Sequence, residues 1–303
     1  MKKEKFIVRS PYDDLEIVCV AYEPDTPAKG IVQIVHGMCE YKARYDEMMT
    51  FFAEHGYVAV AHDQRGHGET AKTVNDRGWF GDKKANAVVE DALQVTEEIK
   101  KRYPGLPITL FGHSMGSMVV RCYIQNHDTC IDKLIVCGSP SNNPLAGVAV
   151  WLTKLISLFK GERHRSKFLS YMSTGKGNDN FPNEGPSAWL SHNRENIDQY
   201  NNDPFCGYIF TCNGFENLFN LMKNTYTKKR YKVGNPNLPI HFVSGSEDAV
   251  LVSEEKWLQS HAFLRSVGYA NVSGKLYHGL RHEIHNEHER DTVYADLLAF
   301  IEK

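Results

Sequence analysis

Residues 107–124 read PITLFGHSMGSMVVRCYI, and the interpretation of the whole chain starts from this stretch. Its first five residues form a short apolar run after a Pro-Gly turn, which predicts a buried strand. Its last seven residues are rich in apolar side chains and lack Pro and Gly, which suits a buried helix. Between them stands Gly112-x-Ser114-x-Gly116. A strand, a sharp glycine-flanked turn and a helix predict a nucleophile elbow, whose strained backbone lifts the serine hydroxyl above a sheet.

The composition is that of a globular protein with a sizeable core. The chain has 303 residues, 42% of them hydrophobic and 24% charged, which permits one large α/β domain or two small ones. The net charge of −2 points to neither nucleic acid nor an anionic membrane as a partner. No apolar run approaches the roughly 18 residues of a membrane span. The N-terminal region lacks the apolar core of a signal peptide, and the seven cysteines form no C-x-x-C pair, so we expect a cytoplasmic protein.

Strand-like and helix-like runs alternate on both sides of the elbow. This rhythm predicts a mostly parallel central sheet with helices on both faces, preceded by an antiparallel hairpin. The predicted strands are 5–9, 15–22, 31–35, 57–61, 107–111, 133–137, 239–243 and 272–277, and the helices besides the one after the elbow are 45–55, 87–101, 254–267 and about 290–303.

The alternation breaks between residues 141 and 238. This segment follows the end of a strand, at the sheet edge where open α/β sheets bind ligands, so we expect a helical lid inserted into one core made of 1–140 and 239–303. Its first helix has an apolar side, and helical patches are expected around Trp189 and over 215–222. The apolar side of that first helix and several aromatics suggest an acyl site, or they pack the lid onto the body. The residues concerned are Val148, Trp151, Leu152, Leu155 and Phe159 of the helix, with Trp189, Phe205, Tyr208, Phe210, Phe215 and Phe219.

A serine nucleophile needs a base and an acid that orients the base, and after an elbow these follow in the order serine, acid, histidine. The first acids at the end of a later strand are Glu247 and Asp248. Asp248 is preferred because it stands last before the loop turns over the sheet, with Glu247 as the alternative. Residues 277–288 contain four histidines, and His282 is the one placed in the loop after the last strand. The spacing H-E-x-H differs from the zinc-binding H-E-x-x-H, so neither a metal nor a cofactor is expected.

Two backbone N–H groups are expected to stabilise the oxyanion. One belongs to Met115, directly after the serine, and the other to Met38, in the loop after an early strand. Cys39 lies beside this loop but has no elbow around it, so we interpret it as an ordinary loop thiol.

Five motifs in this order resemble the monoacylglycerol lipase and lysophospholipase-like branch of the α/β-hydrolases, which overlaps the group called serine aminopeptidase S33. They are His36-Gly37-Met38 with Glu40 and Arg44-Tyr45, Asp63-x-Arg65-Gly66-His67-Gly68, the elbow, Ser246-x-Asp248, and Arg281-His282-Glu283 with Asn286-Glu287. The resemblance spans 31–290 and implies an α/β-hydrolase fold. It also implies Ser114 as nucleophile, Asp248 as orienting acid, His282 as base, and Met38 and Met115 as donors. The chain departs from the family pattern at Ser117 and Glu69.

The leading hypothesis is therefore a serine carboxylester hydrolase that acts through an acyl-enzyme on a small acyl ester, possibly a lipid. The resemblance implies an esterase of the monoacylglycerol lipase or lysophospholipase kind. An S33-type aminopeptidase is the second hypothesis, since the lid acids Glu184, Glu195, Asp198 and Asp203 could receive a free amine. The third is a non-catalytic binding protein on a hydrolase scaffold. The sequence leaves the acyl length, the alcohol and the oligomeric state open.

Overall fold

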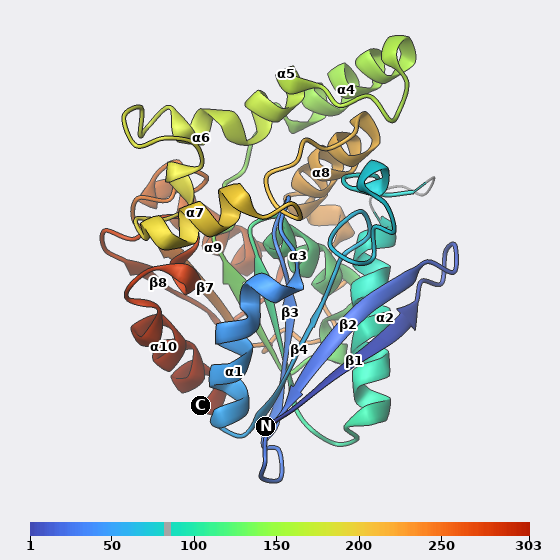
Figure 1. The fold of residues 1–303 in the computed structure, drawn as a ribbon. Helices are drawn as coiled ribbons and strands as arrows, with labels where there is room; N and C mark the ends of the chain where they lie inside the picture. The colour runs from blue at the N-terminus through green and yellow to red at the C-terminus, as the bar shows by residue number, and fades with distance from the viewer. Residues whose placement is uncertain (82–85) are drawn as a thin grey trace.

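The computed structural model describes residues 1–81 and 86–303, and its strands form one sheet in the order β1-β2-β4-β3-β5-β6-β7-β8 (Figure 1). β1 and β2 form the antiparallel hairpin, β2 pairs antiparallel with β4, and all other neighbours are parallel. The predicted mostly parallel sheet is thus confirmed. The strands are β1 (Lys2–Arg9), β2 (Glu16–Glu23), β3 (Gly30–Val35), β4 (Tyr57–His62), β5 (Ile108–His113), β6 (Lys133–Cys137), β7 (Ile240–Gly245) and β8 (Val272–Tyr277).

Helices cover both faces of the sheet, because alternate strand residues point to opposite sides. On β3, Ile31 and Val35 belong to the core under one set of helices, whereas Val32 and Ile34 belong to the core under the other. Parallel strands buried on both faces read as continuous apolar runs, which is why the sequence predicted them well. One face is covered by α1 (Asp46–Glu54) and α10 (Arg290–Glu302), and the other by α2 (Asn86–Arg102), α3 (Met115–His127) and α9 (Glu254–Val267).

Residues 141–238, here called the inserted segment, contribute helices and no strand, and the structure describes the backbone of this segment throughout. The segment lies across the end of the sheet where the parallel strands finish (Figure 1). Its helix α8 packs against α3 below and against α4 above. The helices are α4 (Ala146–Lys160), α5 (Lys167–Ser170), α6 (Lys176–Asn178), α7 (Arg194–Asn202) and α8 (Cys212–Thr225).

Helix α7 was not predicted, because Ile197 is its one aliphatic residue and nearly all of the others are polar. Its start is set instead by Asn193, whose side chain accepts hydrogen bonds from the backbone N–H groups of Glu195 and Asn196. Around Trp189 the expected helical patch is only a 3₁₀ turn, Ala188–Leu190. The expected patch at 215–222 lies within α8.

The apolar side of α4 faces outward, which corrects both expectations for this helix. Ala146, Ala149 and Thr153 form the face that packs against the body, since these small side chains allow close approach to α8. The large side chains on the opposite side are therefore neither an acyl site nor packing onto the core. Of the five residues expected on this side, Val148, Trp151, Leu155 and Phe159 are exposed and Leu152 is half-buried. In the described residues, no helix is long and apolar enough to cross a membrane.

Candidate active site

The turn after β5 has the strained geometry of a nucleophile elbow. β5 continues to His113, two residues beyond the predicted end, and α3 begins at Met115. Ser114 between them has φ 53° and ψ −115°, a conformation that costs a non-glycine residue about 1–3 kcal/mol. A Cβ on Gly112 would lie 2.5 Å from the Gly116 carbonyl oxygen, and one on Gly116 would lie 2.0 Å from the Val35 carbonyl oxygen. Only glycine therefore fits on either side of this turn.

Asp248 and His282 meet behind the elbow. His282 Nδ1 lies 2.9 Å from both carboxylate oxygens of Asp248, and both side chains are buried. Asp248 also accepts hydrogen bonds from Ser244 Oγ and the backbone N–H of Val250. Burial works to raise the pKa of Asp248, but the charge and hydrogen bond of His282 and these donors hold it below its ordinary value. Asp248 is therefore ionised and can fix the ring of His282.

Glu247, the alternative acid, lies elsewhere. Its carboxylate is half exposed and sits 3.1 Å from Nε2 of His192, in the inserted segment. The structure thus brings Asp248, and not Glu247, to His282. Two of the other histidines, His278 and His288, lie in turns after β8 and before α10, and His285 lies in the 3₁₀ turn Ile284–Asn286.

Ser114 and His282 line one cavity of about 150 Å³. The ring of Trp189 packs on His282 with 4.7 Å between ring centroids, which shields the base from water. In the described residues no hydrogen bond joins the Ser114 hydroxyl to His282, an arrangement common before substrate binds. Met38 lines the cavity, and Met115 begins α3 directly after Ser114, which also lines it. Among the described residues, neither backbone N–H has a hydrogen-bond acceptor, so both are free to bind an oxyanion.

Glu40 connects the loops around the cavity. Its Oε1 accepts hydrogen bonds from the backbone N–H of Gly37, the Tyr45 hydroxyl and Nδ1 of His113, and Nε2 of His113 lies 3.3 Å from the His282 carbonyl oxygen. Burial works to raise the pKa of Glu40, but the hydrogen bond and charge of His113 lower it well below its usual value. For His113 burial works in the opposite direction and lowers the pKa, but the hydrogen bond and charge of Glu40 raise this pKa above its usual value. The pair is thus an ionised contact that joins three segments: the elbow, the loop after β3 that carries the candidate oxyanion donor Met38 (the oxyanion loop), and the loop between β8 and α10 that carries His282 (the histidine loop).

Two further acids hold the loop that carries His282. Glu283 accepts hydrogen bonds from Arg44 and from Nδ2 of Asn196 on α7. Glu287 accepts them from the backbone N–H of Arg281 and from three donors of residues 191–193. Sequence reasoning quoted these acids only as parts of motifs and missed what they bind. Their position within five residues of the candidate base was the available indication.

Two histidines and a cysteine beside the cavity form a buried cluster of the side-chain types that bind metals. The ligand atoms of His113, Cys137 and His285 lie within 4.8 Å of one another. However, both ring nitrogens of His113 already have polar partners, Glu40 and the His282 carbonyl. Burial also raises the pKa of the Cys137 thiol well above its usual value, which disfavours the thiolate that a metal needs. The cluster as built does not fit a metal.

The aromatic residues of the inserted segment divide into two groups. Trp189 and Tyr208 line the cavity, whereas Phe210, Phe215 and Phe219 are buried in the core, where they help to pack the segment onto the body. Phe205 lies outside the cavity lining, with its ring against Tyr41. The full lining is Gly37, Met38, Cys39, Glu40, His113, Ser114, Ser170, Thr174, Ser187, Trp189, Leu190, Tyr200, Gly207, Tyr208, His282 and Glu283.

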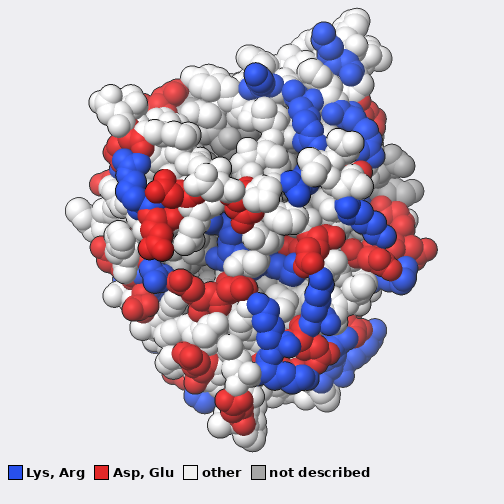
Figure 2. Space-filling view, in the orientation of Figure 1, with Lys and Arg blue, Asp and Glu red and all other residues white. Residues whose placement is uncertain are grey.

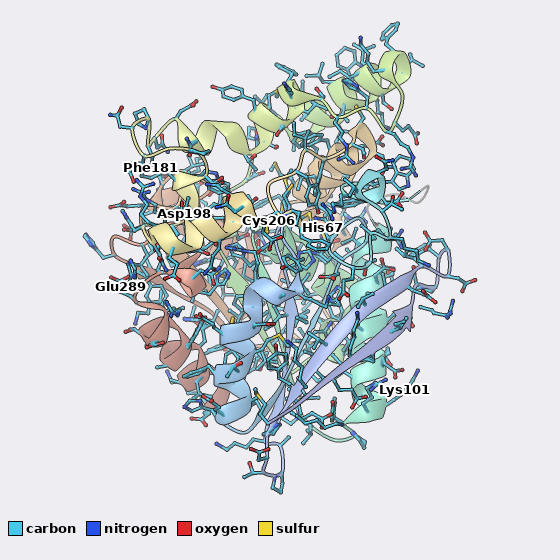
Figure 3. All side chains as sticks on the ribbon, viewed as in Figure 1. His67, Lys101, Phe181, Asp198, Cys206 and Glu289 are labelled. Atoms are coloured by element: carbon cyan, nitrogen blue, oxygen red, sulfur yellow. The ribbon has the colours of Figure 1, made fainter. Side chains whose placement is uncertain are left out.

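The acids that an aminopeptidase would need do not face the cavity. Glu184 pairs with Arg281 at 2.9 Å, and Asp203 accepts a hydrogen bond from the Tyr41 hydroxyl. Asp198, labelled in Figure 3, lies exposed on α7, and Glu195 is exposed on the same helix. Within the described residues, none of these four side chains lines the cavity.

Comparison with known proteins identifies the family. Residues 26–289 match the family model described as serine aminopeptidase, S33, so the chain belongs to this family of α/β-hydrolases. A monoglyceride lipase homolog of monkeypox virus is 26% identical, with 96% of this chain and 94% of the viral protein covered. The mouse monoglyceride lipase is also 26% identical, with 91% of this chain and 86% of the mouse protein covered.

A solved structure agrees with these relatives. The thermostable carboxyl esterase of Bacillus coagulans, determined in complex with glycerol, superimposes with a TM-score of 0.92 at 28% identity, covering 100% of this chain and 98% of the esterase. The predicted α/β-hydrolase fold is confirmed. So is the predicted class of enzyme, a carboxylester hydrolase.

Proposed function

We propose that this enzyme hydrolyses monoacylglycerol-like esters through a covalent acyl-enzyme. The observation that carries the proposal is the buried Asp248–His282 contact beside a serine held at φ 53°. In this scheme Ser114 is the nucleophile, His282 the base and Asp248 the acid that orients it, while the backbone N–H groups of Met38 and Met115 bind the oxyanion.

The reaction follows from these positions. Ser114 Oγ attacks the ester carbonyl carbon while His282 accepts its proton, and the oxyanion lies between the two N–H groups. The bond to the alcohol then breaks, and His282 gives its proton to the leaving alcohol oxygen. Water next attacks the acyl-enzyme with His282 as base, the carboxylic acid leaves, and Ser114 regains its proton.

The lining of the cavity favours a neutral glycerol ester over a lysophospholipid. Among the described residues no Lys or Arg lines the cavity, so nothing there would pair with a phosphate. Hydroxyls of Ser170, Thr174 and Tyr200 offer partners for an alcohol, and Leu190 with Trp189 offers apolar surface for an acyl chain. The two lining carboxylates, Glu40 and Glu283, are already engaged by His113 and Arg44, which leaves little to attract a free amine.

The volume of the cavity limits the length of acyl chain that fits inside it. About 150 Å³ lies below the roughly 300–1,000 Å³ of common small-molecule pockets. We therefore infer that a long acyl chain extends beyond this cavity along the inserted segment, which acts as a lid over the core formed by 1–140 and 239–303.

Hydrolysis of 1-monoacylglycerols with acyl chains from two to sixteen carbons, beside matching lysophosphatidylcholines, tests this function. We expect monoacylglycerols to be hydrolysed and lysophosphatidylcholines to be hydrolysed far more slowly. Ser114→Ala should lose hydrolysis of every ester and labelling by a fluorophosphonate probe. Full activity of Ser114→Ala would contradict the mechanism, and a wild-type chain that the probe does not label would indicate a binding protein. Equal rates on both lipid classes would contradict the assignment of the alcohol.

A further inference from the structure

A second cavity, here called the polar groove, lies between α7 and α1. Its volume is about 610 Å³, which is within the roughly 300–1,000 Å³ of common small-molecule pockets. Its walls come from α7 and the residues that flank it, from the turn that leads into α1, and from the region where α10 begins. Figure 2 shows the surface hollowed between α7 and α1, with blue atoms inside the hollow and red atoms around it. The groove is therefore large enough to hold a ligand of its own.

The buried part of the groove lining consists of polar side chains. Arg44, Asn193 and Asn196 line the groove, and each of these side chains is more than nine-tenths buried. Arg44 donates a hydrogen bond of 2.7 Å to Oδ1 of Asn196, and Nδ2 of Asn193 donates one of 3.0 Å to the carbonyl oxygen of Asn286. Hydrogen bonds hold these buried groups in place, so this part of the lining is shaped before a ligand arrives.

The cations of the lining are already paired within the protein. Arg44 contacts Glu283, and Nε of Arg290 lies 2.6 Å from Glu47. Among the described residues no lysine lines the groove. An anionic ligand would therefore find no unpaired cation there.

The other carboxylates of the lining, apart from one, have partners as well. Nζ of Lys3 lies 3.3 Å from Asp46, and the Tyr41 hydroxyl donates a hydrogen bond of 2.9 Å to Asp203. Within the described part of the chain, only the carboxylate of Glu195 has no side-chain partner. The lining is thus close to neutral in effect, which disfavours a cationic ligand as well.

Uncharged amides provide the hydrogen-bonding groups that remain. Among the described contacts, no hydrogen bond engages the side-chain amide of Gln199, Oδ1 of Asn202 or Oδ1 of Asn286. A hydroxyl group both donates and accepts a hydrogen bond, and an amide offers a partner for each. We propose that the polar groove binds a neutral saccharide, whose hydroxyls bond to these amides.

The groove shares a wall with the catalytic cavity. Glu283 lines the catalytic cavity beside His282, and its Oε2 accepts hydrogen bonds from Arg44, Asn196 and Asn286. All three of these donors line the polar groove. A saccharide bound there therefore contacts the side chains that hold the histidine loop, and it should make opening of this loop rarer. Any effect on hydrolysis rests on the proposed function, whereas binding itself does not.

Titration calorimetry of the full chain with maltose and with trehalose tests the groove, since a disaccharide is too large for the catalytic cavity of about 150 Å³. Ala43→Trp fills the groove without removing a polar group, and Ala43→Ser is its control at the same position. Gln199→Leu removes one amide, and Gln259→Leu, on the exposed face of α9, is its control outside the groove. Unchanged circular dichroism shows that each variant is folded.

We expect saturable binding of at least one disaccharide by the wild type and by both controls. Ala43→Trp should lose this binding, and Gln199→Leu should weaken it about two- to tenfold, the effect of one hydrogen bond. Ser114→Ala should bind the disaccharide as the wild type does, so a failure of the proposed function leaves the groove testable.

Hydrogen exchange measured by mass spectrometry tests the shared wall. The bound disaccharide should slow exchange of the backbone amides of residues 281–287, while the amides of β1, far from the groove, should be unaffected. No saturable binding of either disaccharide by the wild type, or equal binding by Ala43→Trp and Ala43→Ser, would overturn the proposal. Binding of spermidine or glucose 6-phosphate in place of the neutral sugars would overturn the assignment of ligand class, and binding without slower exchange would refute the link to the histidine loop.

Discussion

Replacing Glu40 by Gln tests the buried contact that joins the three loops of the site. The carboxylate accepts three hydrogen bonds, of which the one from His113 is charge-assisted. Gln keeps the shape but removes the charge, and His113 can then release its proton rather than remain a buried cation. The main loss is therefore that of one charge-assisted hydrogen bond, about 1.5–3 kcal/mol, because Arg44, whose Nε lies 3.6 Å from the other Glu40 oxygen, keeps its ion pair with Glu283. The entropy of unfolding is about 2.1 cal/mol/K per residue, so over 303 residues this loss of stability lowers Tm by about 2–5 °C.

The same substitution should lower kcat more than it raises KM. Glu40 holds the backbone N–H of Gly37, next to the proposed oxyanion donor Met38. Complete loss of one oxyanion donor lowers kcat about 10²–10³-fold. Partial displacement of the Met38 N–H group should therefore lower kcat about 10-fold to 100-fold. The assay is calorimetric unfolding together with hydrolysis of p-nitrophenyl butyrate.

Asp91→Asn is the matched control, because Asp91 forms an equally buried contact with Arg65, 2.7 Å long, outside the cavity lining. It should lower Tm while kcat stays within about twofold of wild type. If Glu40→Gln keeps wild-type kcat, or if both variants lose it alike, the argument that Glu40 positions the oxyanion loop is refuted.

The pH dependence of Glu40→Gln has a definite sign. The pKa of His113 is raised in the folded protein, so the contact stabilises fully below the unfolded pKa of histidine, about 6.5, and is lost as pH rises through the folded pKa. The pKa of Glu40 is lowered, so its contribution disappears only in strong acid. The Tm difference between wild type and variant should therefore be largest near pH 5–6 and shrink in alkali.

Three other variants probe the elbow and the triad. Ser114→Gly should abolish hydrolysis yet raise stability by about 1 kcal/mol in calorimetry, because glycine adopts φ 53° without strain; a lower Tm would contradict this. Asp248→Asn should lower kcat about 10⁴-fold in steady-state kinetics, and a loss under tenfold would be inconsistent with its role. Gly116→Ala should cost at least about 3 kcal/mol in urea unfolding, since its Cβ would lie 2.0 Å from a carbonyl oxygen, whereas Gly147→Ala, with open space around it, should not destabilise.

The sheet could be predicted because its strands are buried on both faces. Residues 31–35 and 133–137 carry apolar side chains toward both layers of helices, so local composition alone marks them. The elbow was equally accessible, since its two glycines are required by contacts only a few residues away or on the neighbouring strand. Choosing Asp248 over Glu247 also needed only local sequence, since Asp248 stands last before the loop after β7 turns over the sheet.

The structure of the inserted segment was harder to predict, because it depends on contacts between residues that are far apart in the sequence. Helix α7 has a polar sequence and is held by a side-chain cap and by Asn196, which binds Glu283 almost ninety residues later. The direction in which α4 faces depends on α8, whose position cannot be inferred from the periodicity of α4. Periodicity finds a helix with an apolar side but does not say whether that side meets protein or solvent.

The anchoring of the histidine loop has a consequence for protein engineering. Residues 191–193 bind Glu287, and Asn196 binds Glu283. This part of the inserted segment is therefore attached to the loop that carries His282. Residues 145–180 have no such bond to the histidine loop among the described contacts. A chimera that exchanges only 145–180 for the corresponding part of a relative should keep a working triad, whereas a junction placed beyond 196 should release His282. The boundary for transplanting substrate preference thus lies between these two stretches.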